Sequence, residues 1–433
     1  MKKLIIIALA CSLSWTLSAT EINEGETRSA KVTVNISKSD RINIQAKYTE
    51  LIVEAWDKPQ VEIEAIVRYD GKMTDKIQEF LDDFEQNVKD HIQKGATELL
   101  IDTDLDIPNK IQIGGKHVGI QISYGDDELK VTYKVKAPGV NDYEISNSYE
   151  DVRMIGSFKK VDFKQYSGEL EAEMIEEGIF NMKYGSASIQ QIGNAKMEIY
   201  EQELDARIIG TLELNAKYSN MELAEVETIE ATSYESDYQI GSIDEISGNF
   251  KYGEIEITER LGEGKLEFYE MDMEIEDVEL LVLTSSKYSK FEIEKAKSIT
   301  FEQSYEDETN IGTLGQFKSM NSKYGNHRIE TLESSFQLNA YEDEVEIKSL
   351  SPEASDVYID GKYIDASIGI SNASFILKSN VKYGKVEYDE SSVDVKRYIK
   401  DGDQLEVEAH SKNKRDKSVN ITVNGYEVDV KLN

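Results

Sequence analysis

The residues of this chain that could do chemistry are four histidines and a large number of carboxylates. His91, His117, His327 and His410 stand far apart, and no pair has the H-x-x-x-H or H-E-x-x-H spacing that places two imidazoles on one metal ion. His91 falls on a predicted helix, where we expect a solvated face residue. No G-x-S-x-G, G-x-G-x-x-G or P-loop motif occurs, and the one cysteine, Cys11, precedes the mature chain. These patterns predict no catalytic residue, no cofactor and no metal ligand.

Carboxylates could serve as general acid and base in a glycosidase, which needs two of them a few ångströms apart. Candidate pairs are Glu306 with Asp307 and Glu342 with Asp343, but 84 Asp and Glu residues will give such pairs by chance. The acidic clusters 306–308, 342–344 and 125–128 offer hard oxygen ligands for calcium, yet they lack the repeat of known calcium ladders and the EF-hand loop. We therefore expect exposed acidic corners.

Tyrosines recur roughly every 16–19 residues from Tyr149 to Tyr341, and the spacing then loosens toward Tyr363 and Tyr383. This spacing is the signature of a solenoid. The functional interpretation is an aromatic strip that stacks sugar rings; the structural one is a column of corner residues that pack on one another. Fourteen copies favour the structural role. The predicted ladder consists of Tyr149, Tyr166, Tyr184, Tyr200, Tyr218, Tyr234, Tyr252, Tyr269, Tyr288, Tyr305, Tyr324, Tyr341, Tyr363 and Tyr383.

Short strands must position these tyrosines, because each unit carries alternating apolar pairs such as Ile255 with Ile257 and Leu266 with Phe268. The residue after the tyrosine alternates between Glu and Gly or Ser. Two units per coil would stack Glu on Glu at about 4.8 Å, which is unfavourable. We therefore predict one coil of about 17–19 residues per unit, each Glu neighbouring Gly or Ser, in a rod roughly 60 Å long.

Four segments follow from these patterns. Residues 1–19 have the charged start, apolar run and small-residue exit of a signal peptide, with cleavage between Ala19 and Thr20. A lipid-modified Cys11 is the less favoured alternative. Residues 20–140 read as a strand-rich module with one amphipathic helix at about 74–94. The Tyr-repeat solenoid covers 141–353, and residues 354–433 supply final coils and a C-terminal cap.

The net charge limits the partners of the mature chain. Removal of the leader takes away Lys2 and Lys3 and leaves 47 basic against 84 acidic residues and no cysteine. Such a surface repels nucleic acid, anionic lipid and polyuronate substrates. After leader removal no apolar run is long enough to span a membrane. The fold must then depend on its core and backbone hydrogen bonds without disulfides.

The segments RINIQAKYTELIVEAWDKPQVEIEAIV and VTYKVKAP, the acidic helix between them and the serial KYG and KYS units resemble the bacterial putative-adhesin family of β-strand-repeat proteins. The resemblance covers nearly the whole mature chain. It implies an exported, right-handed parallel β-helix-like solenoid, often encoded beside envelope-stress or anti-sigma regulators, and it supplies no catalytic residues.

We therefore predict an all-β, non-enzymatic, exported solenoid that acts as an interaction or adhesin-like scaffold, in the periplasm or at the surface of a Gram-negative-like bacterium. Its partner would be an envelope or surface protein or a glycan, and the sequence leaves its oligomeric state open. One alternative is a periplasmic accessory to a membrane-bound signalling regulator. The other is a β-helix polysaccharide-degrading enzyme, against which the scarcity of arginine in the repeat argues.

Overall fold

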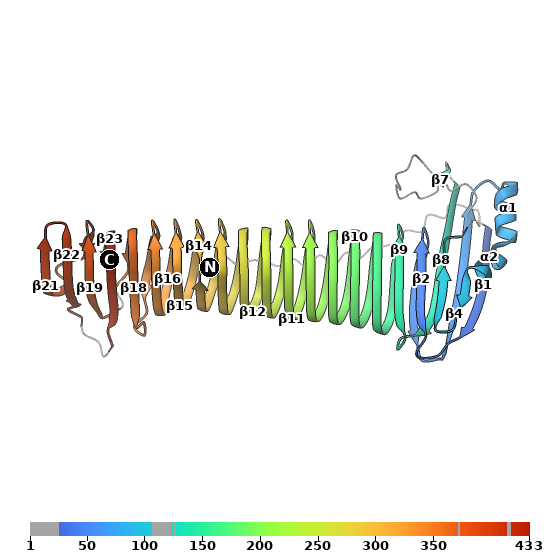
Figure 1. Cartoon of the computed structure of the whole chain (residues 1–433), viewed down its shortest axis with the longest axis horizontal. Helices are drawn as coiled ribbons and strands as arrows, with labels where there is room; N and C mark the ends of the chain where they lie inside the picture. The colour runs from blue at the N-terminus through green and yellow to red at the C-terminus, as the bar shows by residue number, and fades with distance from the viewer. Residues whose placement is uncertain (1–25, 106–122, 125–126, 371–372, 414–416) are drawn as a thin grey trace, which may run out of the picture.

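The computed structural model describes residues 26–105, 123–124, 127–370, 373–413 and 417–433. Within these ranges the chain forms 23 strands and two short helices, so the prediction of an all-β protein is confirmed. The strands join in one hydrogen-bonded sheet that builds a long rod with both helices at one end (Figure 1). The predictions for Ala19, Thr20, Cys11, His117 and the start of the 125–128 cluster lie outside the described residues.

The middle of the rod consists of long strands paired in parallel with the segment about one unit later. Glu203 pairs with Asn220, and Asn220 pairs in turn with Asp237, so each layer lies on the next tyrosine unit of the chain. Asp272 pairs with Lys290 in the same way. These strands are β10 (Val152–Lys217), β11 (Asn220–Tyr234), β12 (Asp237–Lys287), β13 (Lys290–Phe301), β14 (Ser304–Tyr305), β15 (Glu308–Lys323), β16 (Asn326–Tyr341) and β17 (Glu344–Leu350).

In the core, residues of the same type occupy equivalent inward positions in successive layers and stack on one another. One such column runs Ile275, Ile293, Ile311, Ile329, Ile347 and Ile368, each paired in register with the next. All six are at most 3% exposed. Burial of each side chain contributes about 1.5–3 kcal/mol. Alternating apolar residues in the sequence therefore become continuous apolar columns along the rod.

The N-terminal end of the rod contains nine strands and both helices. Its strands are β1 (Glu26–Asn35), β2 (Arg41–Lys47), β3 (Glu50–Trp56), β4 (Gln60–Asp70), β5 (Ile92–Lys94), β6 (Glu98–Asp102), β7 (Ser123–Tyr124), β8 (Asp127–Pro138) and β9 (Asp142–Ser148). The predicted helix at 74–94 is shorter and broken. It forms α1 (Asp75–Asp82) and α2 (Phe84–Asp90), and Ile92 belongs to β5. The N–H groups of Asp83 and His91 end the two helices on carbonyls four residues back.

Strands β2 and β3 form the first layer of the rod. In parallel register β2 pairs with β9, and β3 pairs with the start of β10. The chain then leaves the stack over residues 57–141, and β9 starts the next layer. At this end of the rod β3, β8, β4 and β1 form a mixed sheet, and both helices lie beside it (Figure 1). Phe80, Phe84 and Val88 of the helices are buried.

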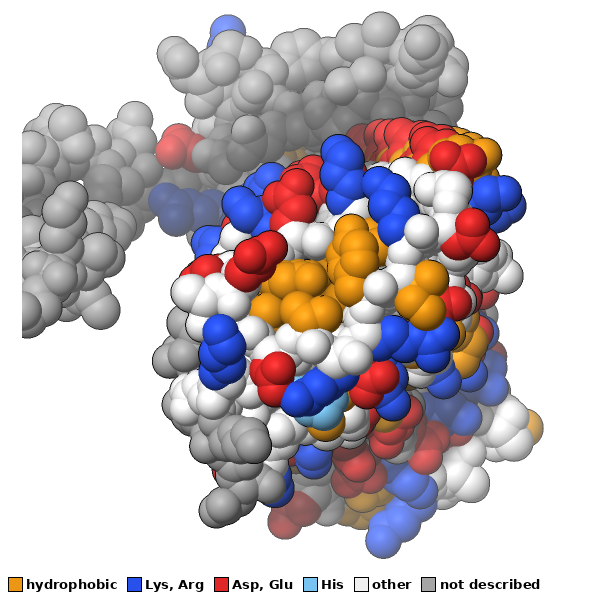
Figure 2. All heavy atoms as spheres, turned by 90° about the vertical axis from the view of Figure 1, so that its left-hand side faces the viewer, with side chains coloured by type: hydrophobic (Ala, Val, Ile, Leu, Met, Phe, Trp, Pro, Cys, Tyr) orange, Lys and Arg blue, Asp and Glu red, His pale blue; other side chains and the backbone are white. Residues whose placement is uncertain are grey.

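At the C-terminal end the chain order and the spatial order differ. The strands are β18 (Asp356–Ile368), β19 (Phe375–Lys382), β20 (Lys385–Glu387), β21 (Val393–Asp401), β22 (Gln404–Ser411) and β23 (Val419–Leu432). The last strand, β23, returns between β18 and β19 and pairs in parallel with both. Antiparallel β22 and β21 complete the end of the rod. The end face carries apolar side chains surrounded by both basic and acidic ones (Figure 2).

Candidate interaction surfaces

One corner of every layer turns through a residue with positive φ, and the identity of that residue alternates. Tyr184, Tyr218 and Tyr252 adopt φ of 61°, 55° and 58°, whereas in the layers between them Glu201 and Glu235 adopt 48° and 47°. Non-glycine residues enter this left-handed region at a cost of roughly 1–2 kcal/mol. The corner position is therefore Tyr in one layer and Glu in the next.

The position before the corner alternates in the opposite phase. Lys217 pairs in register with Tyr234, and Tyr234 with Lys251. The corner amides follow the same register, since Tyr218 N–H donates to the Tyr234 carbonyl at 3.1 Å and Glu235 N–H to the Lys251 carbonyl at 2.8 Å. Consecutive tyrosines therefore come from two different positions of the coil.

This offset of one residue between successive tyrosines explains why the tyrosine intervals alternate between a longer and a shorter value. The layer-to-layer step is constant between Tyr184 and Tyr252, and each tyrosine lies alternately at the corner or one residue before it. The same alternation continues through the slightly longer layers that follow. The structure also corrects the predicted neighbours of the glutamates. By this register the neighbours of Glu235 are Tyr218 and Tyr252, and not Gly or Ser as expected.

Inside the corner, side chains of one layer accept hydrogen bonds from the backbone of the layer before. Ser219 Oγ accepts from Gln202 N–H, and Ser236 Oγ accepts from Ser219 N–H, both at 3.1 Å. Further along, Asp307 Oδ1 accepts from Ser289 N–H at 3.0 Å. These acceptors satisfy amides that the turn removes from the strand ladder. No pattern in the sequence predicts this internal ladder.

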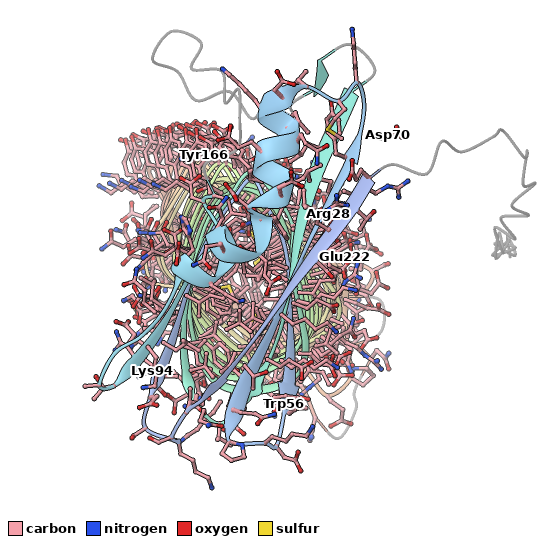
Figure 3. The ribbon with its side chains drawn as sticks, turned by 90° about the vertical axis from the view of Figure 1, so that its right-hand side faces the viewer. Arg28, Trp56, Asp70, Lys94, Tyr166 and Glu222 are labelled. Atoms are coloured by element: carbon pink, nitrogen blue, oxygen red, sulfur yellow. The ribbon has the colours of Figure 1, made fainter. Side chains whose placement is uncertain are left out.

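The tyrosine rings form a continuous column along the rod. From Tyr149 to Tyr363 consecutive rings lie 5.2–5.8 Å apart at steep angles, the edge-to-face arrangement that aromatic pairs prefer. Figure 3, viewed along the rod from its N-terminal end, shows this stack beside the Tyr166 label, with nitrogen-tipped side chains along one side.

The column contains two tyrosines that the repeat analysis missed. Tyr48 stacks on Tyr149 at 5.0 Å, and Tyr426 lies between Tyr363 and Tyr383, at 5.8 and 5.2 Å. The predicted order at the C-terminal end was therefore wrong, because β23 inserts between β18 and β19. The motif K-Y at 47–48, followed by alternating apolar residues, was a usable signal for the first.

Glutamate and lysine flank the column. In the layers with a corner glutamate, the hydrogen bond between Tyr200 and Glu201 is the main cause that raises the pKa of the Tyr200 phenol, and Glu235 acts in the same way on Tyr234. In the alternate layers the corner tyrosines Tyr218, Tyr288 and Tyr324 are 42–44% exposed. The corner is thus an amphipathic surface that offers aromatic carbon, hydroxyl groups and charges of both signs.

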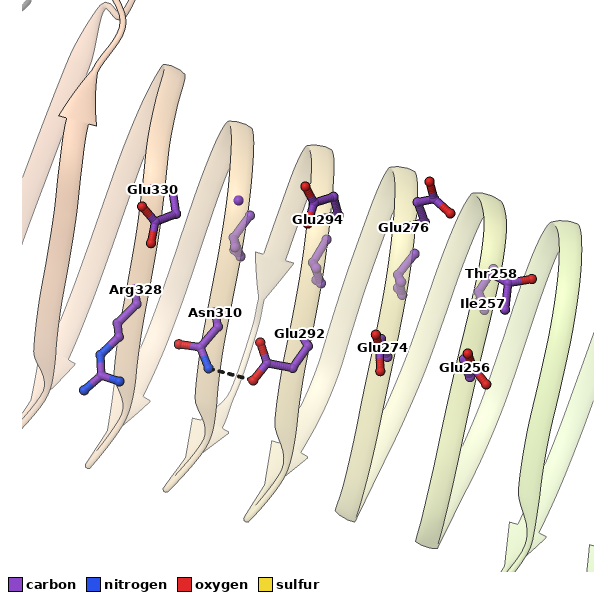
Figure 4. A pocket seen from close by; sticks show the side chains of 14 residues that line it. Glu256, Ile257, Thr258, Glu274, Glu276, Glu292, Glu294, Asn310, Arg328 and Glu330 are labelled. Atoms are coloured by element: carbon purple, nitrogen blue, oxygen red, sulfur yellow. Dashed lines mark hydrogen bonds between the residues drawn. The ribbon is translucent and has the colours of Figure 1, made fainter. Parts of the chain in front are cut away.

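A second surface is a shallow groove on a flat face of the rod, lined by carboxylates (Figure 4). Glu256 and Glu274 of β12 and Glu292 of β13 occupy successive layers, and Glu274 pairs in register with Glu292. The row ends at Asn310, whose Nδ2 donates to Glu292 at 2.9 Å, and at Arg328. Stacked glutamates do occur here, contrary to the premise used to predict the coil. The groove can attract cations or basic side chains.

The candidate acid–base pairs do not form. Asp307 and Asp343 are 2% and 3% exposed and face the interior, whereas Glu306 and Glu342 lie exposed at the corner. The neighbouring carboxylates therefore point to opposite sides of the sheet. Burial is the largest effect on Asp307 and raises its pKa. Asp343 lies 3.5 Å from the fully buried His327, which the sequence analysis did not single out.

The remaining histidines and the search for metal ligands add no site. His91 Nδ1 contacts the Asn87 carbonyl at 2.7 Å, and His410 lies 3.6 Å from Glu408. In the described part of the chain no three His, Cys, Asp or Glu side chains come together as a metal would require. Neither described helix has the length and apolar character needed to cross a bilayer.

Comparisons with known proteins give distant similarities. No family model and no curated protein matches the chain. A solved structure described as a "putative cell adhesion protein" from Clostridium sporogenes shares 9% identity over 94% of this chain and 100% of its own, with a TM-score of 0.18. A "putative adhesin" from Parabacteroides distasonis shares 12% identity over 68% and 98%, with a TM-score of 0.23.

A third structure, described as a "putative lipid binding protein" from Parabacteroides distasonis, shares 14% identity over 78% of this chain and 95% of its own, with a TM-score of 0.18. The first two descriptions agree in kind with the family that the sequence resembles. TM-scores this low do not establish a shared fold, so the three alignments assign the chain to no family.

Proposed function

We propose that this protein is an exported, non-enzymatic interaction scaffold, built as a right-handed parallel β-solenoid with one coil per tyrosine unit. It would act in the cell envelope or at the cell surface. The observation that carries the proposal is the unbroken tyrosine column along one corner of the rod. A surface that repeats the same side chains in every second layer suits many weak contacts to an extended partner.

The chemistry of the column fits a glycan or an extended protein segment. Tyrosine combines a large apolar ring with a hydroxyl and loses little conformational entropy when it binds, which is why it is enriched in recognition surfaces. The acidic flat faces, including the groove at Glu274 and Glu292, repel other polyanions. A nucleic acid is therefore not among the partners that we propose, because its phosphates would be repelled by these faces.

The proposal can be tested with purified residues 20–433 on a glycan array and in pull-downs from envelope extracts. The variant Tyr218→Ser/Tyr288→Ser/Tyr324→Ser should lose most of the binding, because it interrupts the column at three exposed rings. A matched control, Ile179→Ser/Ile208→Ser/Met320→Ser, removes three apolar side chains of similar exposure (38–47%) elsewhere on the rod and should bind normally.

Equal binding by the two variants would refute a role for the column. The enzyme alternative has its own readout: release of reducing or unsaturated ends from a glycan, abolished by a single carboxylate substitution, would replace the scaffold proposal. Surface protease shaving of intact cells would separate a periplasmic rod from an exposed one. A single dominant membrane partner in the pull-down would favour the signalling accessory.

A further inference from the structure

The two flanks of the tyrosine column carry opposite charges. Lysine occurs in every second layer at the position before the corner, at Lys183, Lys217, Lys251, Lys287, Lys323, Lys362 and Lys382. Glutamate occurs in the other layers at the corner itself, at Glu201, Glu235, Glu270, Glu306, Glu342 and Glu427. We call the column together with these two rows the tyrosine strip.

The two rows lie on opposite sides of the rings. A lysine precedes the ring of its own layer, as in Lys217–Tyr218, whereas a glutamate follows the ring of its own layer, as in Tyr234–Glu235. Since all the rings form one column, the lysines lie along one edge of the strip and the glutamates along the other. Within each row the charges are about 9.6 Å apart, which is two strand spacings.

The tyrosine strip is also nearly neutral on a chain whose net charge is −35. From Tyr184 onward each two-layer unit contributes one lysine and one glutamate, whereas the layers of Tyr149 and Tyr166 carry Ser148 and Ser167 at these positions. The neighbouring flat face carries rows of carboxylates. Two copies of a strongly acidic rod repel one another wherever acidic faces meet. Along the strip, that repulsion is replaced by apolar contact and charges of both signs.

We propose that the tyrosine strip is a self-association surface, on which a second copy of this chain packs side by side with the two rods parallel. A two-fold axis along the rods places the lysine edge of one copy opposite the glutamate edge of the other, on both sides of the rings. A two-fold axis across the rods would make them antiparallel and would place lysine opposite lysine. Charge complementarity therefore selects the parallel arrangement.

The contact area is sufficient for a stable dimer. The rings of successive layers from Tyr48 to Tyr383 extend over about 70 Å, at about 4.8 Å per layer. A strip three residues wide measures about 10 Å across, so each copy would bury roughly 700 Å². Stable specific interfaces bury about 800 Å² per partner, with aromatic residues enriched at their centre. The dimer would cover the same rings that the external partner proposed above would contact, so the two would compete for the strip. The experiments below test the dimer with no other partner present, so their outcome is separate from that of the binding assay.

The first test measures the oligomeric state of residues 20–433 by analytical ultracentrifugation over a concentration series. We expect a monomer–dimer equilibrium. The variant Lys217→Glu/Lys251→Glu/Lys287→Glu should weaken the dimer about tenfold or more, since three attractive charge pairs on each side of the rings become repulsive. The control Lys160→Glu/Lys265→Glu/Lys318→Glu makes the same charge change at exposed lysines outside the strip and should dimerise normally.

A charge swap makes the test specific. Addition of Glu235→Lys/Glu270→Lys/Glu306→Lys to the lysine variant exchanges the two edges, so the swapped chain should again dimerise with itself. It should not pair with the unaltered chain, because like charges would then face one another. A monomer at all accessible concentrations, or a control as weak as the lysine variant, would overturn the proposal.

Engineered cysteines report the direction of the rods, since residues 20–433 contain no cysteine of their own. Tyr166→Cys and Tyr363→Cys place one thiol near each end of the strip, at positions 44% and 39% exposed. In parallel rods each variant should form a disulfide with its own copy on mild oxidation. If neither variant cross-links alone while a mixture of the two does, the rods are antiparallel and the proposal fails.

Discussion

Asp307 provides a sharp test of the internal ladder at the corner. Its carboxylate is 2% exposed, accepts from Ser289 N–H at 3.0 Å and accepts from Ser304 Oγ at 2.7 Å. Asp307→Ala removes both acceptor oxygens, so the buried Ser289 amide and the buried Ser304 hydroxyl lose their hydrogen-bond partner. Each unsatisfied buried group costs about 1–3 kcal/mol, so we expect the free energy of unfolding to fall by about 2–5 kcal/mol.

Asp307→Asn should have the opposite effect at neutral pH. Asparagine can accept from Ser289 N–H and donate to Ser304 Oγ, and it carries no charge that burial would penalise. Burial raises the pKa of Asp307 above its usual 3.8, so the folded state keeps the proton to a higher pH than the unfolded state. The stability contributed by this carboxyl is therefore complete below pH 3.8 and is lost as the pH rises through the folded pKa.

We therefore expect Asp307→Asn to be more stable than the unaltered chain at pH 8, with a smaller difference at pH 5.5. Urea unfolding at both pH values measures the global effect, and hydrogen exchange of the peptide that contains Ser289 measures local opening. If the asparagine variant loses as much protection at Ser289 as the alanine variant, the proposed role of the ladder is wrong.

Three further predictions concern other parts of the coil. Phe317→Ala should cost about 3–5 kcal/mol in urea unfolding, because the 2% exposed ring stacks on Phe336 at 4.8 Å; Phe317→Leu should recover most of the loss. Gly248→Ala should cost about 2–4 kcal/mol, since Gly248 has φ +139° and a Cβ there would overlap the Ala231 carbonyl; an unchanged melting temperature would contradict the close approach of these layers. Ser236→Ala should cost about 1–2 kcal/mol and speed hydrogen exchange at Ser219, while Ser236→Thr should not.

The sequence predicted the coil because its period is local. Alternating pairs such as Ile255 and Ile257 recur in every unit and are buried, and parallel stacking of one unit on the next is one arrangement that buries them. The ends were predicted less well, because layer order there is not chain order. Tyr48 stacks on Tyr149 across about a hundred intervening residues, and Tyr426 lies between two tyrosines that precede it in the chain. Local patterns do not determine such long-range pairings.

The arrangement of the corner could in part have been predicted. The regular alternation of longer and shorter tyrosine intervals between Tyr184 and Tyr252 already implied two neighbouring positions in the coil. The inward orientation of Asp307 and Asp343 could not have been predicted, because acidic residues are rarely buried. An exposed position at the corner was the better expectation for both. Backbone amides left over by the turn, which no sequence pattern reveals, make these two positions exceptions.

The choice of residue at the corner itself bears on function. Glycine adopts positive φ without steric strain, whereas the same conformation costs Tyr218 or Glu235 roughly 1 kcal/mol or more. Edge-to-face contact between neighbouring rings contributes about 0.5–1.5 kcal/mol of stability, so for tyrosine this contact nearly offsets the cost of the positive φ. Glutamate at the alternate corners has no such compensation within the fold beyond its bond to the preceding tyrosine. In the proposed dimer the lysine edge of the second copy would lie opposite these glutamates, and that contact would offset the conformational cost of glutamate at the corner.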